Sequence, residues 1–255
     1  MLLDELVSSG RYHFTLPEAV RKLGRPESAA RAALRRLKSK GHLSEPGRGF
    51  FVIVPPEYRR LGCLPAAQFI PHLMDYWGEF YYVALLSAAE NLGSAHQRPQ
   101  VFQVMLSTNH RPVECGQVRV EFIARRDLYE TPVLNTNTPR GHLRVSSAEA
   151  TALELVGYYD RCGGLNNVAT VLAELAERIS GRALQQEAKR CPLAWVQRLG
   201  YLLEFLELDE LATEIQPIVA RAREEATLSP SHHRLGAPRS KRWKLAINVT
   251  VEPDL

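Results

Sequence analysis

The chain has 255 residues, of which 45% are hydrophobic and 24% charged, and its formal net charge is +4. This is the composition of a globular protein with room for a small domain and a larger one. No stretch approaches about 18 uninterrupted apolar residues, and the start carries Asp4 and Glu5 where a secretory signal needs Lys or Arg. We therefore expect a cytoplasmic protein with no membrane partner.

The four cysteines, Cys63, Cys115, Cys162 and Cys191, are widely spaced and form no Cys-x-x-Cys motif. This spacing favours free thiols over a zinc site or a disulfide framework.

The first 57 residues show the order of elements of a winged helix-turn-helix. A short apolar helix near the start is followed by Thr15 and Glu18, which form a Thr-x-x-Glu capping box for a second helix that ends at Gly24. A short turn leads to a third helix over residues 26–40. Two β-rich runs, 42–45 and 50–54, then flank a Pro-Gly-Arg-Gly turn and predict a hairpin.

The helix over 26–40 has one apolar stripe and a basic remainder. Ala30, Ala33, Leu34 and Leu37 recur at i, i+3, i+4 and i+7, so they lie on one face of a helix. Taken alone, the basic remainder could be an ordinary solvated surface. Its position after a helix and a short turn favours a DNA recognition helix.

Charge is unevenly distributed along the chain. Residues 1–60 contain 12 Lys or Arg and 6 Asp or Glu, whereas residues 61–255 contain 20 and 22. Basic side chains that contact phosphates provide most non-specific DNA affinity. We expect side chains near the start of the recognition helix to read base edges, and these are Ser28, Arg31, Ala32 and Arg35. Those better placed for phosphates are Arg21, Lys22, Arg25, Arg36, Lys38 and Arg48.

A domain boundary is predicted near Pro55-Pro56, because two prolines fit neither a continuing strand nor a helix interior. The predicted domains are 1–57, the winged helix, and 62–255, a larger mixed α+β domain. The second is expected to contain helices over 66–77 and 80–92, strands over 100–106 and 117–123, several later helices, and a closing strand over 241–251 that is free to return to the earlier sheet.

A second basic cluster surrounds Trp243 and consists of Arg239, Lys241, Arg242 and Lys244. Basic residues interleaved with an aromatic ring can bind single-stranded nucleic acid, including RNA. The same pattern is equally typical of an edge strand protected from aggregation by charge.

The residues give little support to catalysis. Gly93-Ser94 is typical of a nucleotidyltransferase turn, but those enzymes need paired carboxylates for Mg²⁺ and the chain contains no Asp-x-Asp. We predict no catalytic residue, no bound metal and no cofactor.

The run from Tyr81 to Glu90, continuing from Gly93 to Val104, resembles the AbiEi-type antitoxins, transcriptional regulators of bacterial abortive-infection (type IV) toxin–antitoxin systems. A second similar stretch runs from Ser146 to Leu155 and on to Gly163-Gly164-Leu165, and a third from Trp243 to Val251. The resemblance covers nearly the whole chain and implies a winged helix joined to an antitoxin domain. It also implies autorepression, phage defence and a nucleotidyltransferase-type toxin that is opposed without stable contact.

Together these features predict an autorepressor and antitoxin, monomeric in solution, that binds inverted-repeat promoter DNA with two copies on the operator. The alternative is a protein-interaction antitoxin whose second domain binds and blocks its toxin directly.

Overall fold

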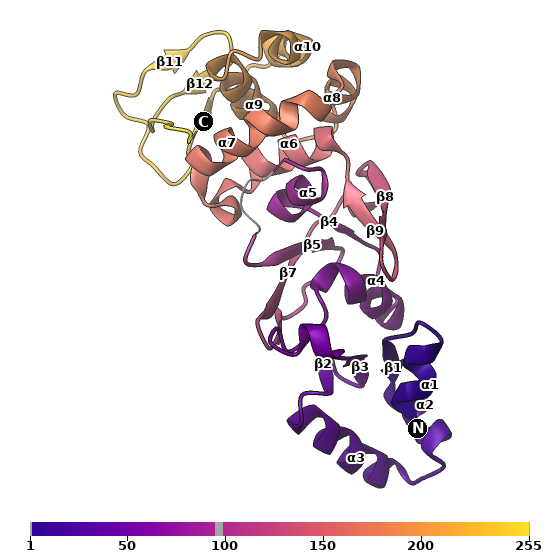
Figure 1. Cartoon of the computed structure of the whole chain (residues 1–255). Helices are drawn as coiled ribbons and strands as arrows, with labels where there is room; N and C mark the ends of the chain where they lie inside the picture. Colours follow the sequence, from indigo (N-terminus) through magenta and orange to yellow (C-terminus); the bar gives the residue numbers. More distant parts are fainter. Residues whose placement is uncertain (1, 95–98, 255) are drawn as a thin grey trace. The chain divides into compact units, whose positions relative to one another are not determined.

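The computed structural model describes residues 2–94 and 99–254 (Figure 1). Ala95, His96 and Gln97, which belong to the stretch carrying the family resemblance, lie outside the described residues. The described residues form two compact units. One contains the residues up to 83 together with 100–145, and the other contains the rest.

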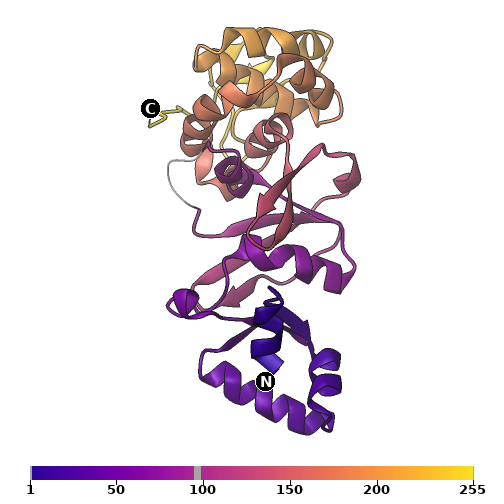
Figure 2. The same cartoon turned by 45° about the vertical axis from the view of Figure 1, so that its right-hand side comes forward.

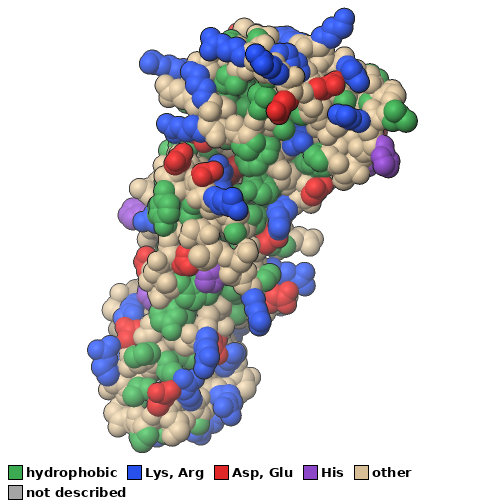
Figure 3. Space-filling view, turned by 180° about the vertical axis from the view of Figure 1, so that it is seen from behind, with side chains coloured by type: hydrophobic (Ala, Val, Ile, Leu, Met, Phe, Trp, Pro, Cys, Tyr) green, Lys and Arg blue, Asp and Glu red, His purple; other side chains and the backbone are tan. Residues whose placement is uncertain are grey.

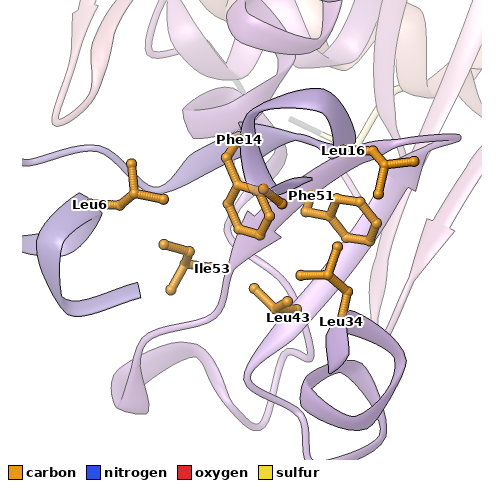
Figure 4. Packing of buried hydrophobic residues seen from close by; sticks show 8 residues of the cluster. Leu6, Phe14, Leu16, Leu34, Leu43, Phe51 and Ile53 are labelled. Atoms are coloured by element: carbon orange, nitrogen blue, oxygen red, sulfur yellow. The ribbon is translucent and has the colours of Figure 1, made fainter. Parts of the chain in front are cut away.

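The first unit begins with a winged helix-turn-helix, as the sequence predicts. Its β3 is the central strand of an antiparallel sheet in the order β1-β3-β2. Side chains from all three helices and all three strands meet beneath this sheet, where Phe14 stacks on Phe51 (Figure 4). The elements are α1 (Leu2–Ser8), β1 (His13–Thr15), α2 (Leu16–Leu23), α3 (Glu27–Ser39), β2 (Leu43–Gly47) and β3 (Phe50–Ile53).

Local signals set the helix ends. The Thr15 hydroxyl accepts from the Glu18 amide and the Glu18 carboxylate accepts from the Thr15 amide, which confirms the predicted capping box. Gly24 ends α2 in the left-handed region, with φ at 60°. Pro26 is the N-cap of α3 rather than its first helical residue.

The remainder of the first unit is built on a six-stranded sheet in the order β6-β7-β5-β4-β9-β8. Strands β5 and β7 are parallel, and β4 and β6 run antiparallel to their neighbours β5 and β7. Its strands are β4 (Tyr81–Val83), β5 (Phe102–Leu106), β6 (Val113–Cys115), β7 (Val118–Ala124), β8 (Val133–Thr138) and β9 (Gly141–Ser146), and helix α4 (Ala66–Trp77) precedes them.

The helix predicted over 80–92 is wrong in its first half. Tyr81–Val83 is strand β4, and the helix, α5 (Leu85–Asn91), begins only at Leu85, which turns the chain with φ at 53°. All three β4 residues are buried between β5 and β9. A strand buried on both faces shows the same continuous apolar run as a buried helix, so the run could not distinguish them.

The second unit is mainly helical. In Figure 2 its helices gather into one bundle, in which α9 packs on α6 and α10, and α10 packs on α8. Besides α5 they are α6 (Ala148–Gly157), α7 (Gly164–Leu175), α8 (Gly181–Ala188), α9 (Leu193–Phe205) and α10 (Asp209–Ala220). Among the described residues, no helix combines the length and apolar character that a membrane crossing requires.

The closing strand predicted over 241–251 is also wrong. Only Leu245–Ala246 forms a strand, β12, and it pairs with β10 (Ala226–Thr227) and β11 (Arg239–Ser240) in a small separate sheet. Trp243 is fully buried against α9, and its indole N–H bonds to Glu204. Packing of this ring on α9 and pairing in the small sheet together hold the segment.

The domains predicted over 1–57 and 62–255 are segments expected to fold independently, and this division stays a prediction. The compact units divide the chain elsewhere, since residues up to 83 belong with the winged helix. Short segments in the 3-10 conformation lie at Pro56–Tyr58, just after Pro55, and at Leu128–Glu130, Tyr159–Cys162 and Ala176–Arg178.

We expect Gly200→Ala to destabilise the protein, although alanine usually stabilises a helix interior relative to glycine. A Cβ at position 200 would lie 2.0 Å from the Trp243 ring, so the ring would have to move, at a cost of about 1–3 kcal/mol. Gly181→Ala is the matched control, because its Cβ would meet only the flexible side chain of Glu214. Thermal unfolding measures both, and an unchanged midpoint for Gly200→Ala would contradict the packing.

We also expect stability to fall as the pH drops from about 6.5 to 4. Burial, with the neighbouring His72 and Arg11, lowers the pKa of His13 to about 4, and its ring stacks on His72 at 3.9 Å. Between these pH values the unfolded chain binds a proton at His13 and the folded chain does not. The contribution of neutral His13 to the free energy of unfolding is therefore fully present above pH 6.5 and is lost as the pH falls toward 4. His13→Phe should flatten the slope in denaturant titrations over this range, whereas an unchanged slope would contradict it.

Candidate nucleic-acid interface

Helix α3 presents one stripe to its core and the opposite stripe to solvent. Ala30 and Leu34 are buried, and Leu34 points toward Phe51 and Leu43 (Figure 4). The four predicted base-edge residues follow at i, i+3, i+4 and i+7 and are all exposed; they are Ser28, Arg31, Ala32 and Arg35. The structure therefore brings them together on one exposed face.

The predicted phosphate contacts are exposed as well. They lie on α2, in the turn after it, on α3 and at the tip of the β2–β3 wing, and are Arg21, Lys22, Arg25, Arg36, Lys38 and Arg48. Figure 3 shows Lys and Arg side chains on the winged helix. Exposed cations at these places could contact the backbone of a duplex on either side of α3.

Ion pairs distinguish these basic side chains from one another. Arg31 Nε lies 2.7 Å from Glu27 Oε1, Lys22 Nζ lies 2.5 Å from Glu5 Oε1, and Lys38 Nζ lies 2.9 Å from Glu45 Oε2. Within the described residues Arg35 makes no ion pair. Of the two arginines in the predicted base-edge stripe, Arg31 is paired with a carboxylate and Arg35 is not, among the described residues.

Glu45, on β2, holds the wing in place. Its Oε1 accepts from the Gly49 amide at 3.1 Å while its Oε2 pairs with Lys38 at the end of α3. The Tyr76 hydroxyl donates to the Arg48 carbonyl at 3.1 Å. The sequence shows Glu45 only as an acid between basic residues, because the fold brings its two partners to it.

The second basic cluster does not assemble as predicted. Trp243 is fully buried, so it cannot stack on a base. Arg239 pairs with Glu225 at 3.4 Å, Arg242 with Glu204 at 2.8 Å, and the Lys244 ammonium donates to the Ala220 carbonyl at the end of α10. Lys241 is exposed. A role for the four basic residues in binding nucleic acid stays a prediction, but Trp243 has no part in it.

No site for a metal ion is seen in the part of the chain that the structure describes, since no three His, Cys, Asp or Glu side chains gather there.

Two family models match the chain. One, described as the AbiEi antitoxin C-terminal domain, matches residues 82–205, and the other, described as a transcriptional regulator, AbiEi antitoxin, matches residues 1–54. Among solved structures, the chain is similar to the RV2827C protein from Mycobacterium tuberculosis, with 17% sequence identity and a TM-score of 0.65 over 96% of this chain and 89% of that one. At this identity the likeness shows a shared fold. A search of curated proteins found no match.

We expect Arg35→Ala to relax sequence preference at one base pair and to cost about 1–3 kcal/mol there, because its guanidinium lies on the base-edge stripe without a competing carboxylate. Lys40→Ala is the matched control, since Lys40 is exposed at the other end of α3 and should weaken binding to all duplexes alike. Titration of specific and random duplexes measures both. Equal losses on the two duplexes for Arg35→Ala would show that Arg35 contacts only backbone.

Proposed function

The chain belongs to the AbiEi family of antitoxins and transcriptional regulators, and from this premise we propose that it represses its own promoter and counteracts a nucleotidyltransferase-type toxin. The winged helix binds inverted-repeat promoter DNA, with one copy on each half-site. The protein acts in the cytoplasm, in phage defence, and performs no catalysis itself.

The observation that carries the DNA-binding half is the exposed stripe of α3. Its side chains occupy the part of a recognition helix that reaches base edges in the major groove, and the wing tip adds Arg48. This stripe lies in the segment that the regulator model matches. The shortage of acids around it favours an anionic partner, because residues 1–60 carry six more basic than acidic residues.

The antitoxin half rests on the match over residues 82–205, which includes most of the helical bundle. We propose that this region opposes the toxin without a stable complex.

One observation favours the rival, direct binding of the toxin. Phe205, at the end of α9, is 43% exposed and stacks on Tyr201. Exposed aromatic side chains are typical anchors of protein interfaces. Gel filtration of the co-expressed proteins separates the two proposals, since only direct blocking predicts that they elute together and that Phe205→Ala separates them.

We expect the triple variant Arg31→Ala, Arg35→Ala and Arg36→Ala to lose operator binding and repression but still to protect cells from the toxin. The three side chains are exposed on α3, so their removal should leave the fold intact. A promoter reporter and a toxin survival assay, at equal expression, measure the two activities.

The matched control removes three exposed arginines from the second unit, Arg221, Arg223 and Arg234, and keeps repression. Retained operator binding by the α3 variant would refute the recognition-helix assignment. Lost protection would show that DNA binding is itself part of neutralisation.

A further inference from the structure

Two stretches of the first unit, 61–63 and 115–117, touch backbone to backbone. A Cβ on Gly62 would lie 2.9 Å from the Gly116 Cα, and a Cβ on Gly116 would lie 2.2 Å from the Leu61 carbonyl oxygen. Both glycines have positive φ, at 74° and 62°, and the Gln117 amide donates to the Leu61 carbonyl at 2.8 Å. Only glycine fits at either position, so this close approach of the two backbones depends on Gly62 and Gly116.

The close approach brings two thiols together. Cys63 follows Gly62 and Cys115 precedes Gly116, and their side chains interact with each other while lying 0% and 9% exposed. Cysteines 52 positions apart in the chain are thus neighbours in the fold. All four cysteines are free thiols, as their spacing predicts, but the spacing does not reveal that these two are neighbours.

The two thiols differ in acidity. The interaction with Cys115 and burial raise the pKa of Cys63. The hydrogen bond from Cys63, the backbone N–H of Glu45 and the charge of Lys38 lower the pKa of Cys115. A thiolate is the reactive form of cysteine, and Cys115 is also the more exposed thiol of the two, at 9% against 0%. We therefore assign Cys115 as the nucleophile that peroxide reaches and Cys63 as its resolving partner.

We propose that Cys63 and Cys115 are a redox modification site that forms a reversible intramolecular disulfide with a peroxide. The Cys115 thiolate attacks one peroxide oxygen, which yields a sulfenic acid as the O–O bond breaks and releases hydroxide. The Cys63 sulfur then attacks the Cys115 sulfur and expels a second hydroxide. The two thiol protons convert the hydroxides to water, so two thiols and one hydrogen peroxide give one disulfide and two waters. A dithiol reductant reverses the modification.

Both sulfurs contact strand β2 of the wing. The Ser44 hydroxyl lies 3.0 Å from Cys63 Sγ, and the Glu45 amide bonds to Cys115, while the Glu45 carboxylate holds Lys38 and the Gly49 amide. Forming the S–S bond draws the sulfurs to about 2.05 Å from each other and away from these partners. Oxidation therefore loosens the strand that supports α3 and the wing. This consequence rests on the proposed operator binding, whereas formation of the disulfide does not.

The test treats reduced full-length protein with hydrogen peroxide. Peptide mapping without reductant should recover residues 63 and 115 in one linked pair, with a mass lower by two hydrogen atoms. Operator binding should weaken about tenfold, the scale expected for the loss of one hydrogen bond, and dithiothreitol should restore it.

The single variants Cys63→Ser and Cys115→Ser should bind the operator but form no linked peptide with peroxide. The control pair Cys162→Ser and Cys191→Ser should form the linked peptide and respond as the wild type does. Should Cys63→Ser fail to fold, Cys115→Ser and the reversal in wild-type protein decide the matter. Absence of the linked peptide would overturn the site, and a linked peptide with unchanged affinity would overturn its effect on the wing. If the reduced protein binds no operator, the proposed function fails, while the peptide map still decides the disulfide.

Discussion

The burial of Leu34 in the core of the winged helix is the constraint on which the candidate interface depends. Leu34 is 2% exposed among Phe14, Leu43 and Phe51. Burying a leucine side chain stabilises a fold by about 1.5–3 kcal/mol, whereas an exposed ion pair contributes about 0–1 kcal/mol. The core, rather than the charges, therefore sets the rotation of α3 about its axis. Once that rotation is fixed, the stripe opposite the buried one must face solvent, and it carries the predicted base-edge residues.

Strand β2 connects this interface to the rest of the first unit. Its outer contacts, through the Glu45 carboxylate, reach the end of α3 and the turn of the wing, and its inner contacts reach both sulfurs of the cysteine pair. A change beneath the strand therefore acts on the two elements that would contact DNA. The glycines at 62 and 116 make this arrangement possible, because any side chain there would separate the backbones that hold the cysteines together.

Features fixed by neighbours in the sequence could be predicted, whereas features fixed by distant partners could not. The capping box at Thr15 and the stripe of α3 depend on residues within a few positions, and both are confirmed. Strand β4 was mistaken for a helix because its identity depends on β5 and β9, which follow it by about 20 to 60 residues. A closing strand was predicted over 241–251, yet the Trp243 ring is held by α9, which no local pattern reveals.

Ion pairs with carboxylates also limit what a count of basic residues can predict about the interface. A count of basic residues ranks all the predicted contacts equally. The fold gives Arg31, Lys22 and Lys38 a carboxylate each, whereas Arg35 has none among the residues that the structure describes. An exposed ion pair contributes only about 0–1 kcal/mol, so transferring a paired side chain to a phosphate costs little affinity. Reading a base is more demanding, because the guanidinium must adopt one bidentate geometry against a planar edge. Under the proposed function, the ion pairs affect specificity more than affinity, and we expect discrimination between operators to depend most on Arg35.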